Sequence, residues 1–306
     1  MIKKTLLLLI FVLCFFCSSL AVPHQIKIKI NGLSNKPVLL AHYFANKKTK
    51  YAVDTAILDS NGRGVFNNSR SLEQGIYLVI LPDYQNFEFL LGEQQNLEIE
   101  ASASPRLRDI KFINAPENIE FSIYKKKKKE SDSTHMAALA SKNKALIAKS
   151  GIKRTEYLAY RKSIQKKYAS TFLEQLISSN IMEENLWKDS LDITVFNNPG
   201  LINTPYYEPK LFYYLDTLIP QGRDTMEKTI STLFNNTLMT GTIFRYLCDA
   251  LQNHYRYKNN YEEIFLYIAD NYYIPFVNWA EVEDMEKLQV AMAAIIINIL
   301  LVVFIF

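Results

Sequence analysis

The period of the hydrophobic pattern changes once along this chain, and that change constrains the fold more than any other feature. Over residues 24–114 apolar residues recur at every second position, and in the segment 26–30 isoleucines alternate with lysines. This alternation is typical of strands with one buried face. Beyond residue 135 apolar residues recur at helical spacing, as at Ile164, Tyr168 and Phe172. The pattern predicts an α+β chain of two segregated domains: an N-terminal antiparallel β-sandwich or barrel, followed by an all-α helical bundle.

Turn signals divide the first part into seven or eight short strands. After the strand at 26–30, we expect strands at residues 37–44, 51–58, 65–66, 76–81, 87–91 and 97–101, with 110–113 closing the set. Residues 59–62 read Asp-Ser-Asn-Gly, and Asn-Gly tolerates the positive φ that a tight hairpin requires. Since no helical stretch intervenes, the sequence predicts a β-domain over residues 22–115.

Five consecutive lysines, Lys125 to Lys129, lie where the period changes. Such a block repels itself and prefers water, so residues 116–135 are interpreted as a basic linker or the exposed start of a helix. The alternative is that the lysines form a patch that binds nucleic acid or anionic lipid. No glycine-rich or aromatic-interleaved frame supports it, and a net charge of +4 is small for a nucleic-acid binder of 306 residues.

Helices are expected over residues 136–280, at 136–148, 157–178, 208–218, 224–238, 240–257 and 261–273, the last ended by Pro275. Asp224 and Glu227 have the spacing of a capping box. This half is rich in tyrosine: Tyr206, Tyr207, Tyr213, Tyr214, Tyr246, Tyr255, Tyr257, Tyr261, Tyr267, Tyr272 and Tyr273. Helical spacing favours packing at the core and its rim, and a peptide- or glycan-binding face remains the alternative.

Residues 1–21 have the pattern of a secretory signal peptide. Lys3 and Lys4 precede an apolar stretch at 6–17, and Ser19 and Ala21 are small residues at a cleavage site. As a helix this stretch would span about 18 Å, short of a bilayer core of about 30 Å. The sequence therefore predicts cleavage after Ala21 and export to the periplasm or cell envelope. Lipidation of Cys17 is the alternative, although bulky Phe16 fits a lipobox poorly.

Residues 281–306 form a hydrophobic tail. From Val290 to Phe306 the run is broken only by Asn298, and as a helix it would be about 25 Å long, at the short edge of a membrane span. So many large apolar side chains need an apolar environment. The sequence predicts membrane contact through this tail. A buried terminal strand and a tail created by an altered reading frame are the alternatives.

No catalytic motif is present in the sequence. The candidate titratable residues are isolated from one another: His24, His42, Asp54, Asp59, His135 and His254. After cleavage of the leader, Cys248 is the only cysteine, and a lone cysteine on an apolar helix face is usually a small buried hydrophobic residue. Three cysteines also exclude a disulfide framework or a Cys-rich zinc site. We therefore predict no catalytic, cofactor-binding or metal-binding residue.

The order of the two predicted domains, a β-domain followed by a helical domain, resembles that of a known family. Residues 51–56 (Tyr-Ala-Val-Asp-Thr-Ala), 59–62 and 75–78 (Gly-Ile-Tyr-Leu) resemble the β-domain of unknown function that begins many Bacteroidota cell-envelope thiol-disulfide oxidoreductases. Residues 203–207 (Asn-Thr-Pro-Tyr-Tyr) and 264–273 resemble the helical domain of unknown function that often follows it. Together these motifs cover residues 24–280. In such relatives a thioredoxin-like domain with a Cys-x-x-Cys motif comes next.

This chain departs from the family at that point, because no cysteine follows Ala280. Redox chemistry of that kind needs two neighbouring thiols, so the activity is not carried over. The first hypothesis is a non-catalytic exported module that binds an unknown protein, peptide or glycan, and not nucleic acid. The alternative is a truncated or accessory part of a thioredoxin-like oxidoreductase, with a truncation or changed reading frame near residue 280. A hydrolase with an unrecognised site is the third and weakest hypothesis.

Overall fold

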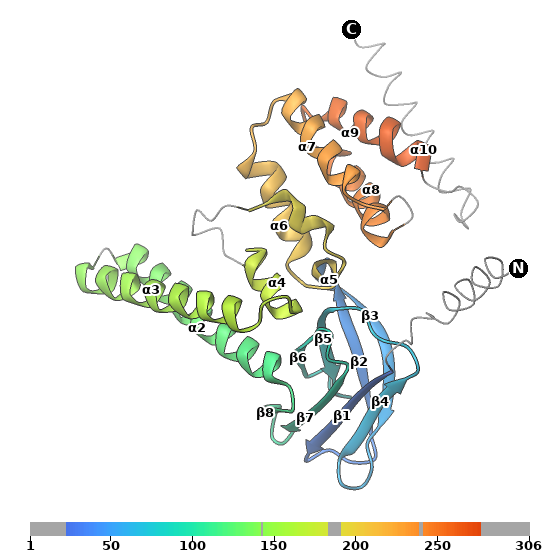
Figure 1. Ribbon diagram of the computed structural model, residues 1–306, viewed down its shortest axis with the longest axis vertical. Coiled ribbons are helices and arrows are strands. Elements are labelled where there is room, and N and C mark those ends of the chain that lie inside the picture. Colours follow the sequence, from blue (N-terminus) through green and yellow to red (C-terminus); the bar gives the residue numbers. More distant parts are fainter. Residues whose placement is uncertain (1–22, 142, 183–190, 239–240, 277–306) are drawn as a thin grey trace, which may run out of the picture. The chain divides into compact units, whose positions relative to one another are not determined.

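The computed structural model describes residues 23–141, 143–182, 191–238 and 241–276 (Figure 1). Within them, a β region is followed by a helical region, which confirms the predicted α+β layout. The chain forms two compact units that divide between Pro220 and Gln221, and the helices are distributed over both. The predicted leader (1–21) and the whole of the predicted tail (281–306), including the run from Val290 to Phe306, lie outside the described residues.

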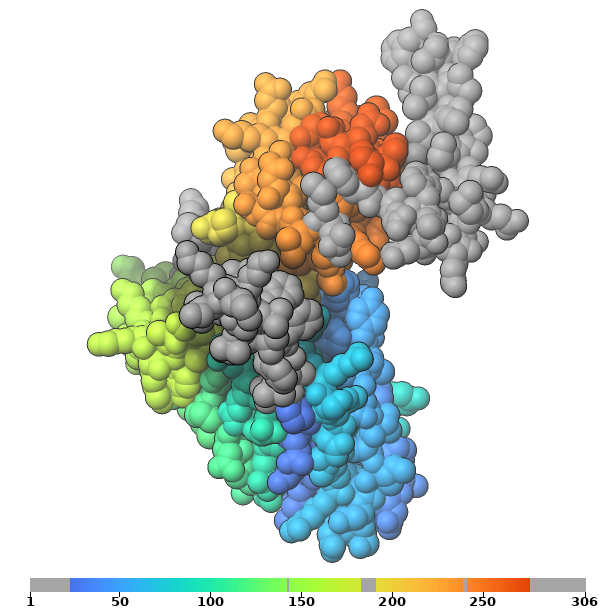
Figure 2. All heavy atoms as spheres, turned by 45° about the vertical axis from the view of Figure 1, so that its right-hand side comes forward, coloured from blue at the N-terminus to red at the C-terminus, as the bar shows by residue number. Residues whose placement is uncertain are grey.

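Eight strands form two four-stranded sheets in the first unit. The first sheet has the order β4-β1-β7-β8, and the second has the order β3-β2-β5-β6. The strands are β1 (His24–Asn31), β2 (Pro37–Phe44), β3 (Asn46–Ile57), β4 (Arg63–Asn68), β5 (Gly75–Ile80), β6 (Asn86–Leu91), β7 (Asn96–Ser102) and β8 (Arg108–Ile113). Neighbours pair antiparallel except β1 and β7, which pair in parallel. In the space-filling view, the N-terminal strands, coloured blue, form a continuous outer surface of this unit (Figure 2).

The alternating isoleucines of β1 enter the core between the sheets. Ile26 and Ile30 are fully buried there, together with Phe66 of β4. The turn at residues 59–62 joins β3 to β4 as predicted, with Gly62 at φ 74°. A Cβ on Gly62 would lie 2.4 Å from the carbonyl oxygen of Ile30, so this turn requires glycine both for its backbone conformation and for space.

Strand β5, in the interior of the second sheet, is buried on both faces. On β5, Tyr77 and Val79 belong to the core between the sheets. Ile76 and Leu78 alternate with them and are equally buried, because helices pack on the other face. A strand covered on both sides reads as a continuous apolar run, which is why residues 75–80 lack the alternation seen in β1.

The first unit continues as helices. They are α2 (Pro116–Ser141), α3 (Lys144–Lys167), α4 (Phe172–Ser178), a 3-10 turn (Ile193–Asn197), α5 (Pro199–Ile202), α6 (Tyr207–Tyr213) and a π-helical turn (Tyr214–Leu218). Helices α2 and α3 lie side by side as a hairpin (Figure 1). The hydroxyl groups of Tyr124 and Tyr157 lie 2.8 Å apart inside this hairpin, where both side chains are buried.

The second unit consists of α7 (Arg223–Asn235), α8 (Thr242–Tyr255), α9 (Glu262–Ile268), a π-helical turn (Ala269–Tyr273) and α10 (Ile274–Phe276). The rings of Phe234 and Tyr272 stack at 3.9 Å in its core. Most tyrosines of this unit pack at the core or its rim, while Tyr257 is 82% exposed. In the part of the chain that the structure describes, no helix combines the length and the apolar character that crossing a membrane requires.

Candidate functional site

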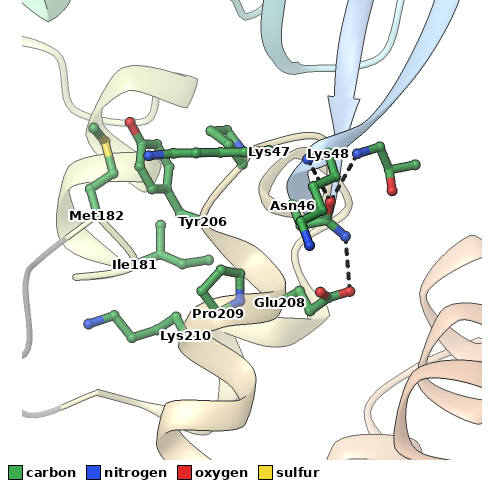
Figure 3. Close-up of a pocket in the computed structure, with 11 residues that line it drawn as sticks. Asn46, Lys47, Lys48, Ile181, Met182, Tyr206, Glu208, Pro209 and Lys210 are labelled. Atoms are coloured by element: carbon green, nitrogen blue, oxygen red, sulfur yellow. Dashed lines mark hydrogen bonds between the residues drawn. The ribbon is translucent and has the colours of Figure 1, made fainter. Parts of the chain in front are cut away.

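Two adjoining hollows in the first unit share Lys47, Met182 and Tyr206 in their walls. Their volumes are about 530 Å³ and about 560 Å³. We call the two together the lysine cleft, and the first hollow is drawn in Figure 3. The walls of the lysine cleft come from four segments: the start of β3, one face of α2, Ile181 and Met182 after α4, and the residues around the start of α6.

A tight turn at the start of β3 positions Lys47 and Lys48. Ala45 adopts φ 59°, and the Oδ1 atom of Asn46 accepts hydrogen bonds from the backbone N–H groups of Lys48 and Thr49, each at 2.9 Å. The Nδ2 group of Asn46 donates to Oε2 of Glu208 at 3.1 Å (Figure 3). The Asn46 side chain thus links the backbone that carries the two lysines to Glu208, and this fixes the turn in place.

The wall around α6 is bonded to the same turn. The N–H of Ala45 donates to the carbonyl oxygen of Ile202 at 2.6 Å, and the N–H of Glu208 donates to the carbonyl oxygen of Ala45 at 2.8 Å. These two bonds hold Tyr206, Pro209 and the rest of this wall against β3.

Residues 203–207, which carry part of the family resemblance, also attach the helical segment to the second sheet. Asn203 accepts a hydrogen bond from the N–H of Ile76 at 2.9 Å and donates to Glu73 at 3.0 Å. A Cβ on Gly75 would lie 2.6 Å from that of Asn203, so the close approach requires glycine. The motif therefore has a structural role, which is to attach the helices to β5.

The third wall is one face of α2, where the lining residues follow helical spacing: Lys125, Lys128, Lys129, Asp132, Ser133 and Met136. Lys128 is only 8% exposed and pairs with Asp132, so the expectation that the lysine run is a wholly solvated face is wrong at this position. The carboxylate of Asp132, one helical turn after Lys128, provides the ion-pair partner that allows this lysine to be buried.

Lys125 is tied to the second sheet. Its ammonium group lies 3.2 Å from Oε2 of Glu88, and the hydroxyl group of Tyr43 donates to Oε1 of Glu88 at 2.7 Å. Burial, followed by the interaction with Glu88, raises the pKa of Tyr43. The tyrosine therefore stays protonated and keeps donating, so strands β2 and β6 together hold this end of α2.

The lining of the cleft has an excess of positive charge. Among the described lining residues, six lysines face two carboxylates, those of Asp132 and Glu208. Among the described residues, no carboxylate forms an ion pair with Lys47, Lys48 or Lys129. Apolar atoms of methionine, proline, isoleucine and tyrosine complete the walls. This arrangement can hold an anionic ligand that also presents apolar groups.

The histidines predicted as isolated lie in separate local contacts. His42 packs beside Tyr51 and Tyr77, and burial lowers its pKa. His24 contacts the carbonyl oxygen of Arg70, and His135 lies 3.3 Å from the hydroxyl oxygen of Ser150. Over the described ranges, no three His, Cys, Asp or Glu side chains gather as metal ligands.

The remaining candidates have structural roles. Asp59 accepts from the backbone N–H groups of Asn61 and Arg63 in the β3–β4 turn. Asp54 accepts from the N–H of Thr55, and His254 packs edge-on against the ring of Tyr255. None of these side chains lines the lysine cleft.

Cys248 is 1% exposed, as predicted for a small buried hydrophobic residue. Burial, with a contribution from Asp249, raises the pKa of its thiol to about 12. Only about one thiol in ten thousand would then be ionised at pH 8. In the chain that begins at Val22, where Cys248 is the only cysteine, we expect the native state to react with a thiol reagent such as DTNB at least about a hundredfold more slowly than the urea-unfolded state. Equal rates in the two states would contradict this burial.

Comparison with known proteins gives no match: no family model fits the chain, and no curated protein or solved structure is significantly similar to it. The resemblance to the Bacteroidota domains therefore stays an expectation from the sequence, and the geometry described above is what supports a function.

Proposed function

We propose that this chain is a non-catalytic module that is exported to the cell envelope and binds an anionic partner in the lysine cleft. One observation carries the binding proposal: among the described residues, six lysines from three separate segments, β3, α2 and α6, line two adjoining hollows whose walls hold two carboxylates. Clefts lined by charge of one sign concentrate ligands of the opposite sign. Holding Lys47 and Lys48 on a hydrogen-bonded turn reduces the entropy lost when a ligand binds.

The residues of the cleft favour binding over catalysis. Within the described residues neither histidine nor cysteine lines it, and these are the side chains most often used for proton transfer or covalent attack near neutral pH. The buried thiol of Cys248 gives no support to the alternative of a redox enzyme. We expect no insulin reduction by the isolated chain. Reduction that is lost in Cys248→Ser would favour the redox alternative instead.

Export rests on the leader sequence. Because a cleaved signal peptide would leave Val22 as the first residue, mass spectrometry of the native protein should find Val22 at its N-terminus in the envelope fraction. Native protein with Met1 intact in the cytosol would contradict export. Export would also separate the chain from nucleic acid, so we propose a protein, peptide or glycan partner.

The proposed contact of the tail with the membrane has its own test. A variant that lacks the residues from Val290 to Phe306 should move from the membrane fraction to the soluble fraction. An unchanged distribution between the two fractions would contradict the membrane contact and leave the binding proposal standing.

The binding proposal is tested with a fluorescein-labelled decaglutamate. Its affinity, measured by fluorescence anisotropy at low salt, should fall at least about tenfold in the double variant Lys47→Glu/Lys129→Glu, because each reversal replaces attraction by repulsion in the cleft. Raising the salt concentration should weaken binding to the native chain. Both substituted side chains are exposed, so the fold should be retained.

The matched control is Lys27→Glu/Lys162→Glu, which changes the net charge equally at exposed positions outside the cleft. This control should retain the affinity to within about threefold, since only long-range charge is altered. An equal loss in both double variants would show that binding follows the net charge alone. That result, or an absence of binding to the native chain, would contradict the proposed site.

A further inference from the structure

The lysines of the cleft fall into two groups. Lys48 and Lys210 line the first hollow, while Lys125, Lys128 and Lys129 line the second, with Lys47 shared by both. A ligand that uses the whole cleft would therefore present negative charge at two separate places. Each hollow has a volume within the range of small-molecule sites, about 300–1,000 Å³, so the two together have room for several residues of an extended chain.

The wall shared by the two hollows is largely apolar. Besides Lys47, it consists of Met182 and Tyr206. In Figure 3 the Lys47 side chain extends from its turn toward these two residues. Methionine adapts to ligand side chains of different shapes, and tyrosine offers a ring face with a polar end. Met136 and Ile181 add further apolar surface on either side.

The type of cationic side chain in the cleft also indicates which chemical class of ligand it can bind. In the described part of the cleft the cations are all lysines, with no arginine among them. Ammonium groups on flexible stems act as point charges, whereas planar recognition of phosphate or sulfate typically uses the two-pronged guanidinium group. Asp132 and Glu208 place negative charge in the hollows and so favour a ligand whose acidic residues are interrupted by uncharged ones over one that is anionic along its whole length, which would still bind but less tightly.

We infer that the lysine cleft binds an extended peptide segment in which acidic residues flank an apolar side chain, with a carboxylate in each hollow and the apolar side chain against Met182 and Tyr206. This inference rests on the proposed function and specifies its ligand. It assigns the selectivity of the site to the order of charged and apolar residues in the partner, and not to total negative charge.

Three capped hexapeptides of equal length test the inference by isothermal titration calorimetry on the full chain. They are Glu-Glu-Leu-Phe-Glu-Glu, Glu-Glu-Gly-Ser-Glu-Glu and Gln-Gln-Leu-Phe-Gln-Gln. The first should bind about tenfold more tightly than the second, which has the same charge but no apolar centre. The third should bind at least about tenfold more weakly than the first, because it lacks the carboxylates.

The variant Met182→Ser should reduce the advantage of Glu-Glu-Leu-Phe-Glu-Glu over Glu-Glu-Gly-Ser-Glu-Glu to less than about threefold. Met182 is buried, so a second pair of variants at exposed positions of α2 accompanies it. Met136→Ser, inside the cleft, should weaken the Leu-Phe peptide, and Leu139→Ser, outside it, should not. The three peptide affinities are compared on the native chain without any substitution, so that comparison is unaffected by a folding defect in a variant.

The outcomes separate the two proposals. Equal affinity for the Leu-Phe and Gly-Ser peptides would overturn the inference and leave anion binding in place. No binding of any acidic peptide would overturn both. Tighter binding of a heparin hexasaccharide or of phosphatidylglycerol vesicles than of the Leu-Phe peptide, when lost in Lys47→Glu/Lys129→Glu, would assign the cleft to a glycan or to a lipid surface and overturn the peptide inference.

Discussion

Phe172→Ala is expected to lower the free energy of unfolding of the first unit by about 3–5 kcal/mol, the usual range for removal of a fully buried aromatic ring. Phe172 begins α4 and is 0% exposed. Its ring fills the space beside Gly200 of α5, and its Cβ lies close to Gly92 in the connection from β6 to β7. Urea denaturation followed by circular dichroism measures the change.

A pair of identical substitutions serves as the control for this packing. A Cβ on Gly200 would lie 2.6 Å from Cε2 of Phe172, so Gly200→Ala should destabilise the unit by about 1–3 kcal/mol. Gly151 lies within α3 with nothing within 4 Å of its added Cβ, so Gly151→Ala should stabilise it by about 0.5–1 kcal/mol. If both substitutions had the same sign, or if Phe172→Ala cost less than about 1 kcal/mol, the described contact would be wrong.

Asn118→Leu is expected to cost about 2–6 kcal/mol, because it leaves two buried backbone groups without partners at about 1–3 kcal/mol each. Asn118 of α2 is 2% exposed. Its Oδ1 atom accepts from the N–H of Leu90 at 2.6 Å, and its Nδ2 group donates to the carbonyl oxygen of Leu90 at 2.9 Å. Leu90 lies on β6, an edge strand of the second sheet, so this side chain takes the place of a neighbouring strand.

Two further variants isolate that effect. Lys126→Leu adds the same residue at an exposed position of α2 and should change the stability by less than about 0.5 kcal/mol. Asn118→Asp keeps an acceptor but lacks a donor when ionised, so its deficit should shrink as the pH falls and the carboxyl group is protonated. A loss below about 1 kcal/mol for Asn118→Leu, or no pH dependence for Asn118→Asp, would contradict the paired hydrogen bonds.

The β region was predictable because its determinants are local. The alternation at residues 26–30 and the Asp-Ser-Asn-Gly turn are recognisable in the sequence, and the structure places both as expected. The parallel pairing of β1 with β7 was not predictable from these patterns. It joins segments about seventy positions apart, and the register depends on tertiary packing more than on either segment alone.

Helix boundaries were predicted less well. The single helix expected at 157–178 is interrupted, because Ser170 adopts φ 69° and Thr171 caps a new helix by accepting from the N–H of Glu174. The predicted capping box is wrong, since Gly222 is the N-cap of α7 and Glu227 pairs with Arg223 instead of reaching back to Asp224.

Pro275 also differs from the expectation, because the helical conformation includes it and Phe276, the last described residue. It lies inside α10, directly after a π-helical turn over residues 269–273. A π turn changes the hydrogen-bond spacing just before the proline, which itself has no N–H to donate.

The lysine cleft was beyond prediction from the sequence. The run from Lys125 to Lys129 was recognised, but its interpretation as a solvated face did not place it opposite Lys47. Lys47 and Lys48 carry no motif of their own, and a second lysine cluster at residues 47–50 was the only available signal. Their convergence depends on bonds such as those between Ala45 and residues 202 and 208, which join segments far apart in the chain.

The most direct test of the account is hydrogen–deuterium exchange of the full chain with and without Glu-Glu-Leu-Phe-Glu-Glu. The account predicts slower exchange on binding in the segments that line the lysine cleft, at residues 46–50, 125–136 and 205–210, with no change over residues 221–276. Slower exchange confined to the tyrosine-rich second unit would assign recognition to the aromatic helices, and would contradict the lysine cleft as the binding site.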